Sequence, residues 1–200
     1  MGQQKSLRSD RRGAALAEFG LIIPVLLILL MGAFDAGHRL YARSVLQGAV
    51  QKAARDAGLE NGTAASRQAS IDAGVRSQLL NIHKDAAVTI DRRAYRDFAN
   101  AAAPAETFTD TDNDGVCDGG EPFEDINRNG TRDLDIGILG QGGAEDAVVY
   151  TVRMRYTSVT PVSAIVGINN QVDMTAQTVL RNQPYNDQSP ALSPLVGNCP

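Results

Sequence analysis

The dominant hydrophobic pattern of the chain is a continuous apolar run near its N-terminus. Residues 13–34 carry one charged side chain, Glu18, and the run is long enough to cross a bilayer core of about 30 Å. Apolar residues then recur at three- and four-residue steps as far as Gly58, a glycine suited to ending a helix. These positions are Leu40, Leu46, Ala49, Val50, Ala53 and Ala57. We therefore predict one helix over 14–58, membrane-spanning first and an amphipathic stalk afterwards.

The rest of the chain has shorter periodic segments. A second helix is expected over about 63–81, with Ile71, Val75, Leu79 and Ile82 on one face. Alternating apolar and polar residues predict strands over 87–92, 147–157 and 171–182. Strands of this kind bury one face, and the apolar stripe of the stalk can cover it. The expected fold is α+β, with the long helix packed on a small antiparallel sheet.

The charges before the apolar run predict how the chain is oriented. Residues 1–13 contain four cationic residues and only one acidic residue, Asp10, an excess that keeps a short segment on the cytoplasmic side. A secretory signal would also begin this way, but the run has no small-residue cleavage site at its end and continues into amphipathic helix. The expected organisation is a cytoplasmic leader (1–13), the helix (14–58), a periplasmic α+β domain (59–185) and an irregular, proline-containing tail (186–200).

The residues around the start of the apolar run resemble a known processing site. A glycine, four small or apolar residues, a glutamate and an aromatic residue, behind a basic leader, resemble the cleavage site of type IV prepilins. The pair Glu18-Phe19 resembles that of the tight-adherence (Tad/Flp) pilins. The residues that extend the resemblance to the TadE-like pseudopilin family are Pro24, Gly32, Asp35, Gly37, the segment 53–55 and the segment 180–185.

This resemblance implies a pilin-like fold and a structural role rather than an enzyme. A separate prepilin peptidase would cut between Gly13 and Ala14, and Glu18 and Phe19 would serve assembly. The chain would be a minor subunit of the tight-adherence pilus system, a single-pass inner-membrane protein with a periplasmic domain, incorporated into or supporting an extracellular pilus. Its partners would be other pilins or pseudopilins and the Tad assembly platform. TadE-type and TadF-type subunits both remain open.

Glu18 is notable on physical grounds as well. A carboxylate within the hydrocarbon region costs about 2.5 to 3.5 kcal/mol on insertion scales, so such a residue is by default a functional candidate. The alternative is a glutamate close enough to the interface to reach the headgroups.

An acidic segment, 110–133, is the second candidate for chemistry. Its first part fits the calcium-loop pattern D-x-D-x-D-G-x5-E, which gathers hard oxygen ligands around one centre. The candidate ligands are Asp110, Asp112, Asp114, the carbonyl of Val116, Asp118 and Glu121. A solvated turn is the alternative. The segment lacks flanking helix signals and resembles the calcium loops of dockerins or thrombospondin type 3 repeats.

A weaker copy of this pattern follows fifteen residues later. It contains Asp125, Asn127, Asn129 and Asp133, with Ile136 where the first copy has Glu121. A second calcium ion and a polar turn packed against the first loop are both consistent with it.

Composition narrows the remaining classes. The net charge of -4 and the absence of tryptophan argue against nucleic acid as a partner. The two cysteines, Cys117 and Cys199, lack the spacing of a zinc site, and the sequence leaves open whether they pair. His38 and His83 have no catalytic partners at suitable spacing. The alternative to a pilus subunit is a membrane-anchored periplasmic calcium-binding protein.

Overall fold

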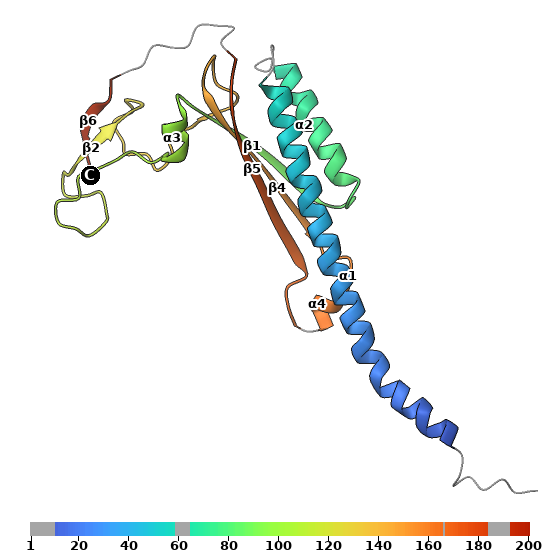
Figure 1. Ribbon diagram of the computed structural model, residues 1–200. Helices are drawn as coiled ribbons and strands as arrows, with labels where there is room; N and C mark the ends of the chain where they lie inside the picture. The colour runs from blue at the N-terminus through green and yellow to red at the C-terminus, as the bar shows by residue number, and fades with distance from the viewer. Residues whose placement is uncertain (1–10, 59–64, 166, 184–192) are drawn as a thin grey trace, which may run out of the picture.

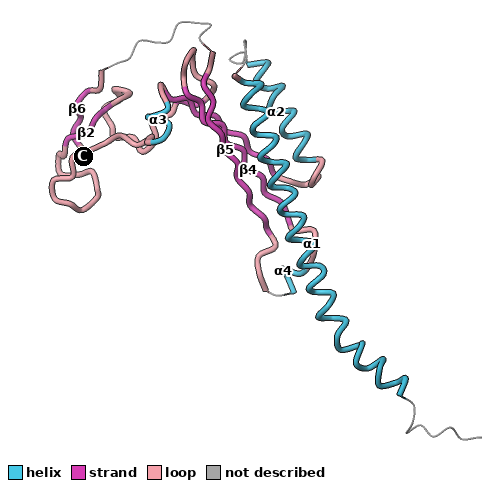
Figure 2. Tube along the Cα trace, in the orientation of Figure 1, coloured by secondary structure: helices cyan, strands magenta, loops and turns pink. Residues whose placement is uncertain are grey.

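The computed structural model describes residues 11–58, 65–165, 167–183 and 193–200. A long helix, α1 (Arg11–Ala57), runs beside a four-stranded antiparallel sheet, and a two-stranded sheet lies apart from it (Figures 1 and 2). The other elements are α2 (Ala65–Leu80), β1 (Ala87–Tyr95), α3 (Phe98–Ala102), β2 (Pro122–Asp125), β3 (Ile138–Leu139), β4 (Ala147–Thr157), α4 (Val162–Ile165), β5 (Gln171–Arg181) and β6 (Leu195–Asn198).

Helix α1 has two halves with different surroundings. Its first half projects away from the domain (Figure 1), and most of its large apolar side chains are exposed there, from 45% at Leu26 to 78% at Leu21. The helix continues through Pro24 and is long and apolar enough to cross a membrane. The second half lies along the sheet, where Leu46 and Val50 are almost completely buried. One helix therefore serves both as a free apolar rod and as part of the core.

The four-stranded sheet has the order β3-β1-β4-β5, and alternate residues of β4 and β5 face α1. Tyr150, Val152 and Met154 are at most 1% exposed. Ile71, Val75 and Leu79 lie on one buried face of α2, as expected, and this face packs in the core that includes α1. Helix α3 contacts β1 and β4. The α+β fold with a long helix on a small antiparallel sheet is confirmed.

The predicted stalk stripe needs one correction. Leu40 is 68% exposed, whereas Ala42 is completely buried. Leu46, Ala42 and Asp35 are buried, and their separations of four and seven residues place them on one face of the helix. Leu40 does not share this spacing and lies on another face. The core-facing stripe therefore extends as far as Asp35, directly after the apolar run.

The expectation of an irregular tail over 186–200 was wrong for the part that the structure describes. Leu195–Asn198 form β6, which pairs antiparallel with β2, and Cys199 forms a disulfide with Cys117 across a Cα–Cα distance of 5.3 Å. Four residues without alternation carry no strand signal of their own. Their conformation comes from the partner strand and the crosslink.

A buried polar group joins α2 to the sheet. Asp72 of α2 accepts two hydrogen bonds from Arg92 of β1, at 2.7 and 2.5 Å, and one from the hydroxyl of Tyr150, at 3.0 Å. The Arg92 guanidinium also lies 4.7 Å from the centre of the Tyr150 ring. Burial, followed by the negative charge of Asp72, raises the pKa of Tyr150 well above its usual range. This cluster fixes the position of α2 across the core.

Candidate functional site

The four candidate processing and assembly residues lie on the exposed first turns of α1. Gly13, Ala14, Glu18 and Phe19 are all exposed, and a Cβ built on Gly13 would meet no atom within 4 Å. Among the side chains that the structure describes, none pairs with Glu18. A carboxylate on a free apolar rod is therefore available to a group outside this chain.

The first acidic loop, residues 110–121, gathers three aspartates. Carboxylate oxygens of Asp110, Asp112 and Asp114 lie within 4.8 Å of one another and could hold a metal ion. The carboxylate of Asp110 accepts the N–H groups of Asp114, at 3.2 Å, and Gly115, at 2.9 Å. Gly115 has φ +79, a left-handed conformation that suits glycine and allows the chain to turn back around the cluster. The backbone thus holds the three carboxylates together despite their mutual repulsion.

Glu121 ends this loop and is hydrogen-bonded to a residue near its start. Its Oε1 accepts hydrogen bonds from the N–H and the hydroxyl of Thr111, at 2.5 and 3.0 Å. Its Oε2 is buried and has no hydrogen-bond partner in the part of the chain that the structure describes, and the residue as a whole is 6% exposed. A buried carboxylate oxygen without a donor is costly, so a cation beside it would satisfy a real deficit.

The other two proposed ligands lie less centrally. Val116 is 54% exposed and donates its N–H to Asp114 at 2.7 Å. Asp118 is exposed, and its backbone carbonyl accepts the N–H of Glu121 at 3.0 Å. Neither side chain belongs to the three-aspartate cluster.

The pKa of Asp112 reflects the crowding of negative charge. A hydrogen bond from the Asp114 N–H lowers this pKa, but desolvation and the charges of Asp114, Glu121 and Asp118 oppose it, and the net shift is upward from 3.8. An upward shift means that the folded loop resists full ionisation. The oxygen-rich donor set and its excess negative charge fit a hard divalent cation such as Ca²⁺.

The second acidic loop, which begins at Asp125, repeats the backbone of the first. Asn113 and Arg128 have φ values of 63 and 60, and Gly115 and Gly130 have values of 79 and 78. Asp125 accepts the N–H groups of Asn129 and Gly130, at 3.1 and 2.8 Å, just as Asp110 does for the residues fifteen positions earlier. The two segments are therefore structural repeats.

The repeats also pair with each other across an approximate twofold relation. Phe108 and Phe123, fifteen residues apart, form an antiparallel bridge. On either side of it, Thr109 donates to the carbonyl of Pro122 and Glu124 donates to that of Thr107, both at 2.9 Å. We call residues 106–133 the paired-loop module. The repeated pattern is E-x-F-x-D-x-[DN]-x-[DN]-G-x-x-D, over 106–118 and 121–133.

In this module each leading glutamate supports the loop of the other repeat. Glu121 binds the Thr111 N–H, and Glu106 binds the equivalent Ile126 N–H at 2.7 Å. Glu106 is completely buried and its second oxygen accepts the N–H of Asp133 at 2.9 Å, so both of its oxygens are satisfied. The second oxygen of Glu121 has no such donor. This is the main structural difference between two otherwise matching loops.

The second loop balances its charges internally. The side-chain amides of Asn127 and Asn129 donate to Asp133 at 2.6 and 2.7 Å. Residues 125–133 contain two aspartates and two arginines, a net charge of zero, whereas 110–121 contain five acidic and no basic residues, a net charge of -5. The second loop thus has the form of a polar turn packed against the first. Its Asp133 carboxylate is satisfied by amide donors.

Sequence reasoning missed Glu106 and Thr111. Glu106 precedes the calcium pattern, which begins at Asp110, and Thr111 occupies one of the positions that this pattern leaves unspecified. The shared E-x-F-x-D start of the two repeats was the signal that would have found Glu106.

The two histidines lie together on Tyr156. The ring centroids of His38 and His83 are 5.8 and 5.0 Å from that of Tyr156, and the Nδ1 atoms of both histidines are buried without a hydrogen-bond partner. This is aromatic packing between α1, the end of α2 and β4.

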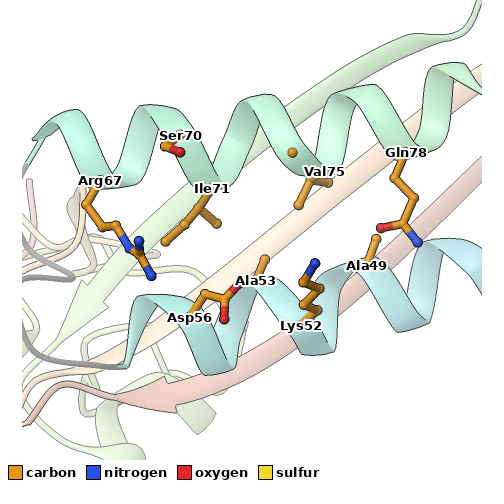
Figure 3. A pocket seen from close by; sticks show the side chains of 10 residues that line it. Ala49, Lys52, Ala53, Asp56, Arg67, Ser70, Ile71, Val75 and Gln78 are labelled. Carbon is orange, nitrogen blue, oxygen red and sulfur yellow. The ribbon is translucent and has the colours of Figure 1, made fainter.

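A cavity of about 200 Å³ lies between α1 and α2 (Figure 3). The cavity exists because the small residues Ala49, Ala53 and Gly74 leave space between the helices. The charged residues Lys52, Asp56 and Arg67 also line it. Its mixture of charges specifies no ligand class.

Comparison with known proteins bears on α1. No curated protein and no solved structure matches the chain. A family match exists for its N-terminal part, which begins at the candidate cleavage glycine and includes the apolar rod and the core-facing half of the helix. Residues 13–55 of this protein match the model of the TadE-like protein family.

Proposed function

We propose that this chain is a TadE-like pseudopilin, a minor pilin-like subunit of a tight-adherence pilus assembly system. The observation that carries the proposal is the family match over residues 13–55, which covers Gly13, Glu18 and both halves of α1. The shape of the chain agrees with this role. An apolar rod that leaves its own domain can lie in a membrane first and pack among other helices later.

In this proposal Gly13 and Ala14 flank the bond cut by a separate prepilin peptidase. Glu18 then lies near the new N-terminus, and its carboxylate pairs with the free amine of Ala14 on a neighbouring subunit. A charge-assisted contact of this kind replaces hydration that is lost in an apolar surrounding. Phe19, 58% exposed, packs against the same neighbour. The chain itself is a structural subunit and not an enzyme.

The proposed location is the inner membrane with the folded domain in the periplasm. The cationic excess of the leader favours a cytoplasmic N-terminus. The disulfide between Cys117 and Cys199 supports an oxidising compartment for the domain, because such bonds are rare in the cytosol.

The test is the mature mass of the protein in cells that contain the Tad system. Wild type should lose residues 1–13, and Gly13→Val should keep them. Gly20→Val is the matched control, because a Cβ at either glycine meets no atom within 4 Å. Equal masses for wild type and Gly13→Val, or an N-terminus other than Ala14, would contradict the assignment. An uncleaved anchor would favour the alternative, a periplasmic cation-binding protein that is not part of a pilus.

A second function is favoured by one specific observation, the three carboxylates of Asp110, Asp112 and Asp114 gathered within 4.8 Å of one another. Glu121, whose Oε2 is buried and has no partner among the described residues, is hydrogen-bonded to Thr111 of the same loop. We propose that the first loop binds Ca²⁺ through Asp110, Asp112, Asp114 and Glu121, with the Val116 carbonyl and Asp118 completing the oxygen set. The loop lacks flanking helices, so the expected dissociation constant is in the weak extracellular range of about 10⁻⁴ to 10⁻³ M. Binding would order a segment of the subunit far from the membrane helix.

A further inference from the structure

The connection between β4 and β5 is unusually apolar for an exposed hairpin. Residues 158–170 contain no charged side chain. Val159, Ile165 and Ile168 are 52%, 58% and 65% exposed. We propose that this connection, which we call the hairpin tip, inserts into the headgroup boundary of the same bilayer that α1 crosses. The proposal rests on membrane insertion of α1 and not on pilus assembly.

The position of the hairpin tip carries the argument. Thr157 and Gln171 are the last paired residues of β4 and β5, so the tip projects beyond that end of the sheet. The Ser158 hydroxyl donates to the carboxylate of Asp35, and α4 packs on α1. Figures 1 and 2 show α4 beside α1 at the level where the helix leaves the domain. Asp35 directly follows the apolar run 13–34, so a helix that spans the bilayer places the tip at the membrane surface.

The backbone of the tip is suited to a weakly hydrated environment. The N–H groups of Ile165 and Ile168 donate within the tip, to the carbonyls of Pro161 and Ser163, at 3.0 and 2.7 Å. Internal bonds of this kind reduce the cost of leaving water, because fewer polar groups lose a partner. On the neighbouring turn of α1, Leu40 and Tyr41 are 68% and 60% exposed, and tyrosine is enriched at membrane interfaces. In this proposal, these side chains and the tip both contact the headgroup region.

A second copy of the chain could also cover an apolar tip. The bilayer is favoured because the tip is continuous with the proposed membrane-spanning segment through Asp35, and because the tip lacks the charged side chains that usually rim a specific protein contact. Together, the hairpin tip and α1 would hold the domain to the membrane at two points. This would restrict rotation of the domain about the helix axis.

The test uses the absence of tryptophan from the chain. Ile168→Trp introduces a single reporter at the tip of the full-length protein. Val196→Trp, at a 78% exposed position of β6, is the aqueous control, and Leu26→Trp reports on the membrane helix. Each variant is reconstituted at high lipid excess into phosphatidylethanolamine and phosphatidylglycerol vesicles whose acyl chains are brominated either near the headgroup or near the chain end.

The expected result is a blue-shifted emission for Ile168→Trp, with strong loss of intensity in the vesicles brominated near the headgroup and none for Val196→Trp. Quenching of Ile168→Trp no greater than that of Val196→Trp, while Leu26→Trp is quenched, overturns the proposal and leaves the anchor intact. A blue shift without bromine quenching that grows with the protein-to-lipid ratio also overturns it, in favour of a contact between copies. Failure of Leu26→Trp to be quenched would reject the spanning helix itself, and the tip proposal with it, without bearing on Gly13 processing.

Discussion

Glu106 and Glu121, fifteen residues apart, hold equivalent positions in two repeats, and each binds the loop that the other repeat carries. Only Glu121 has an oxygen left without a donor. The two loops of the module therefore differ in how their negative charges are balanced. In the second loop the side-chain amides of Asn127 and Asn129 donate to Asp133, whereas the first loop gathers three carboxylates that could hold a metal ion.

This difference predicts that calcium stabilises one of two matched variants and not the other. Saturating calcium should raise the unfolding midpoint of the wild type, by an increment of about 2.7 kcal/mol at a hundredfold excess over the dissociation constant. Glu121→Gln keeps the acceptor for Thr111 but removes the charge, so the calcium increment should largely vanish. Glu106→Gln loses one buried hydrogen bond and should cost about 1 to 3 kcal/mol with or without calcium, keeping the increment.

The measurement is a thermal melt of the full chain in detergent, in EDTA and in millimolar calcium. Superimposable wild-type curves would identify the first loop as an acidic turn. A lost increment in Glu106→Gln instead of Glu121→Gln would assign the ion to the other repeat.

The raised pKa of Asp112 gives a pH dependence whose sign changes with calcium. Because the folded loop favours the protonated carboxyl, Asp112 contributes stability below its ordinary value of 3.8, and this contribution is lost as pH rises through the raised pKa. Calcium reverses the sign, because the cation favours ionised carboxylates. The difference in unfolding free energy between wild type and Asp112→Asn, followed with pH, should therefore fall in EDTA and rise in calcium. Parallel profiles in the two conditions would contradict direct ligation by Asp112.

The Cys117–Cys199 disulfide should stabilise the β2–β6 sheet specifically. The crosslinked residues are 82 positions apart, and loop-closure entropy gives an upper estimate of about 4.5 kcal/mol for such a bond. Replacing both cysteines by serine should remove hydrogen-exchange protection from β2 and β6 while leaving β4 and β5 protected. Equal loss of protection in both sheets would show that the crosslink supports the whole domain.

The buried pair Asp72–Arg92 should matter far more than a surface pair of the same chemistry. The Arg92 side chain is 9% exposed, so Asp72→Ala leaves a buried cation unpaired and should cost about 3 kcal/mol. Asp173, which pairs with Arg155 at 2.6 Å where both side chains are about 60% exposed, is the control. Asp173→Ala should cost about 0 to 1 kcal/mol. Urea unfolding of the two variants measures both, and similar costs would refute a special role for the Asp72 cluster.

Glu18→Ala should separate processing from assembly. The carboxylate has no partner in the described part of the chain, so its removal leaves the fold and cleavage unchanged. Pilus yield should drop sharply, because the contact with the amine of the next subunit is lost. Leu21→Ala on the same exposed helix is the control. Normal pilus levels from Glu18→Ala would point to a glutamate that only reaches the headgroups.

The elements predicted well from the sequence are those whose pattern is local. Strand β4 was predicted with its observed bounds, Ala147–Thr157, because five alternate apolar residues all face the core. Strand β6 has no such pattern, and it forms because β2 and the disulfide lie beside it. Likewise, the three aspartates of the first loop were predicted from their short spacing. The hydrogen bonds of Glu106 to the second loop depend on pairing between the two repeats, which no short spacing indicates. Contacts set by distant partners are what local periodicity omits.

Because the second half of α1 packs on strands that come much later in the sequence, it cannot be buried when it is first synthesised. Leu46 and Val50 leave the ribosome well before β5, which completes the wall they face and follows more than 120 residues later. During synthesis the core-facing stripe of the helix is therefore still partly bare until β5 has been made. A nascent chain of this design has to be shielded, by the translocation machinery or a chaperone, until its last long strand arrives.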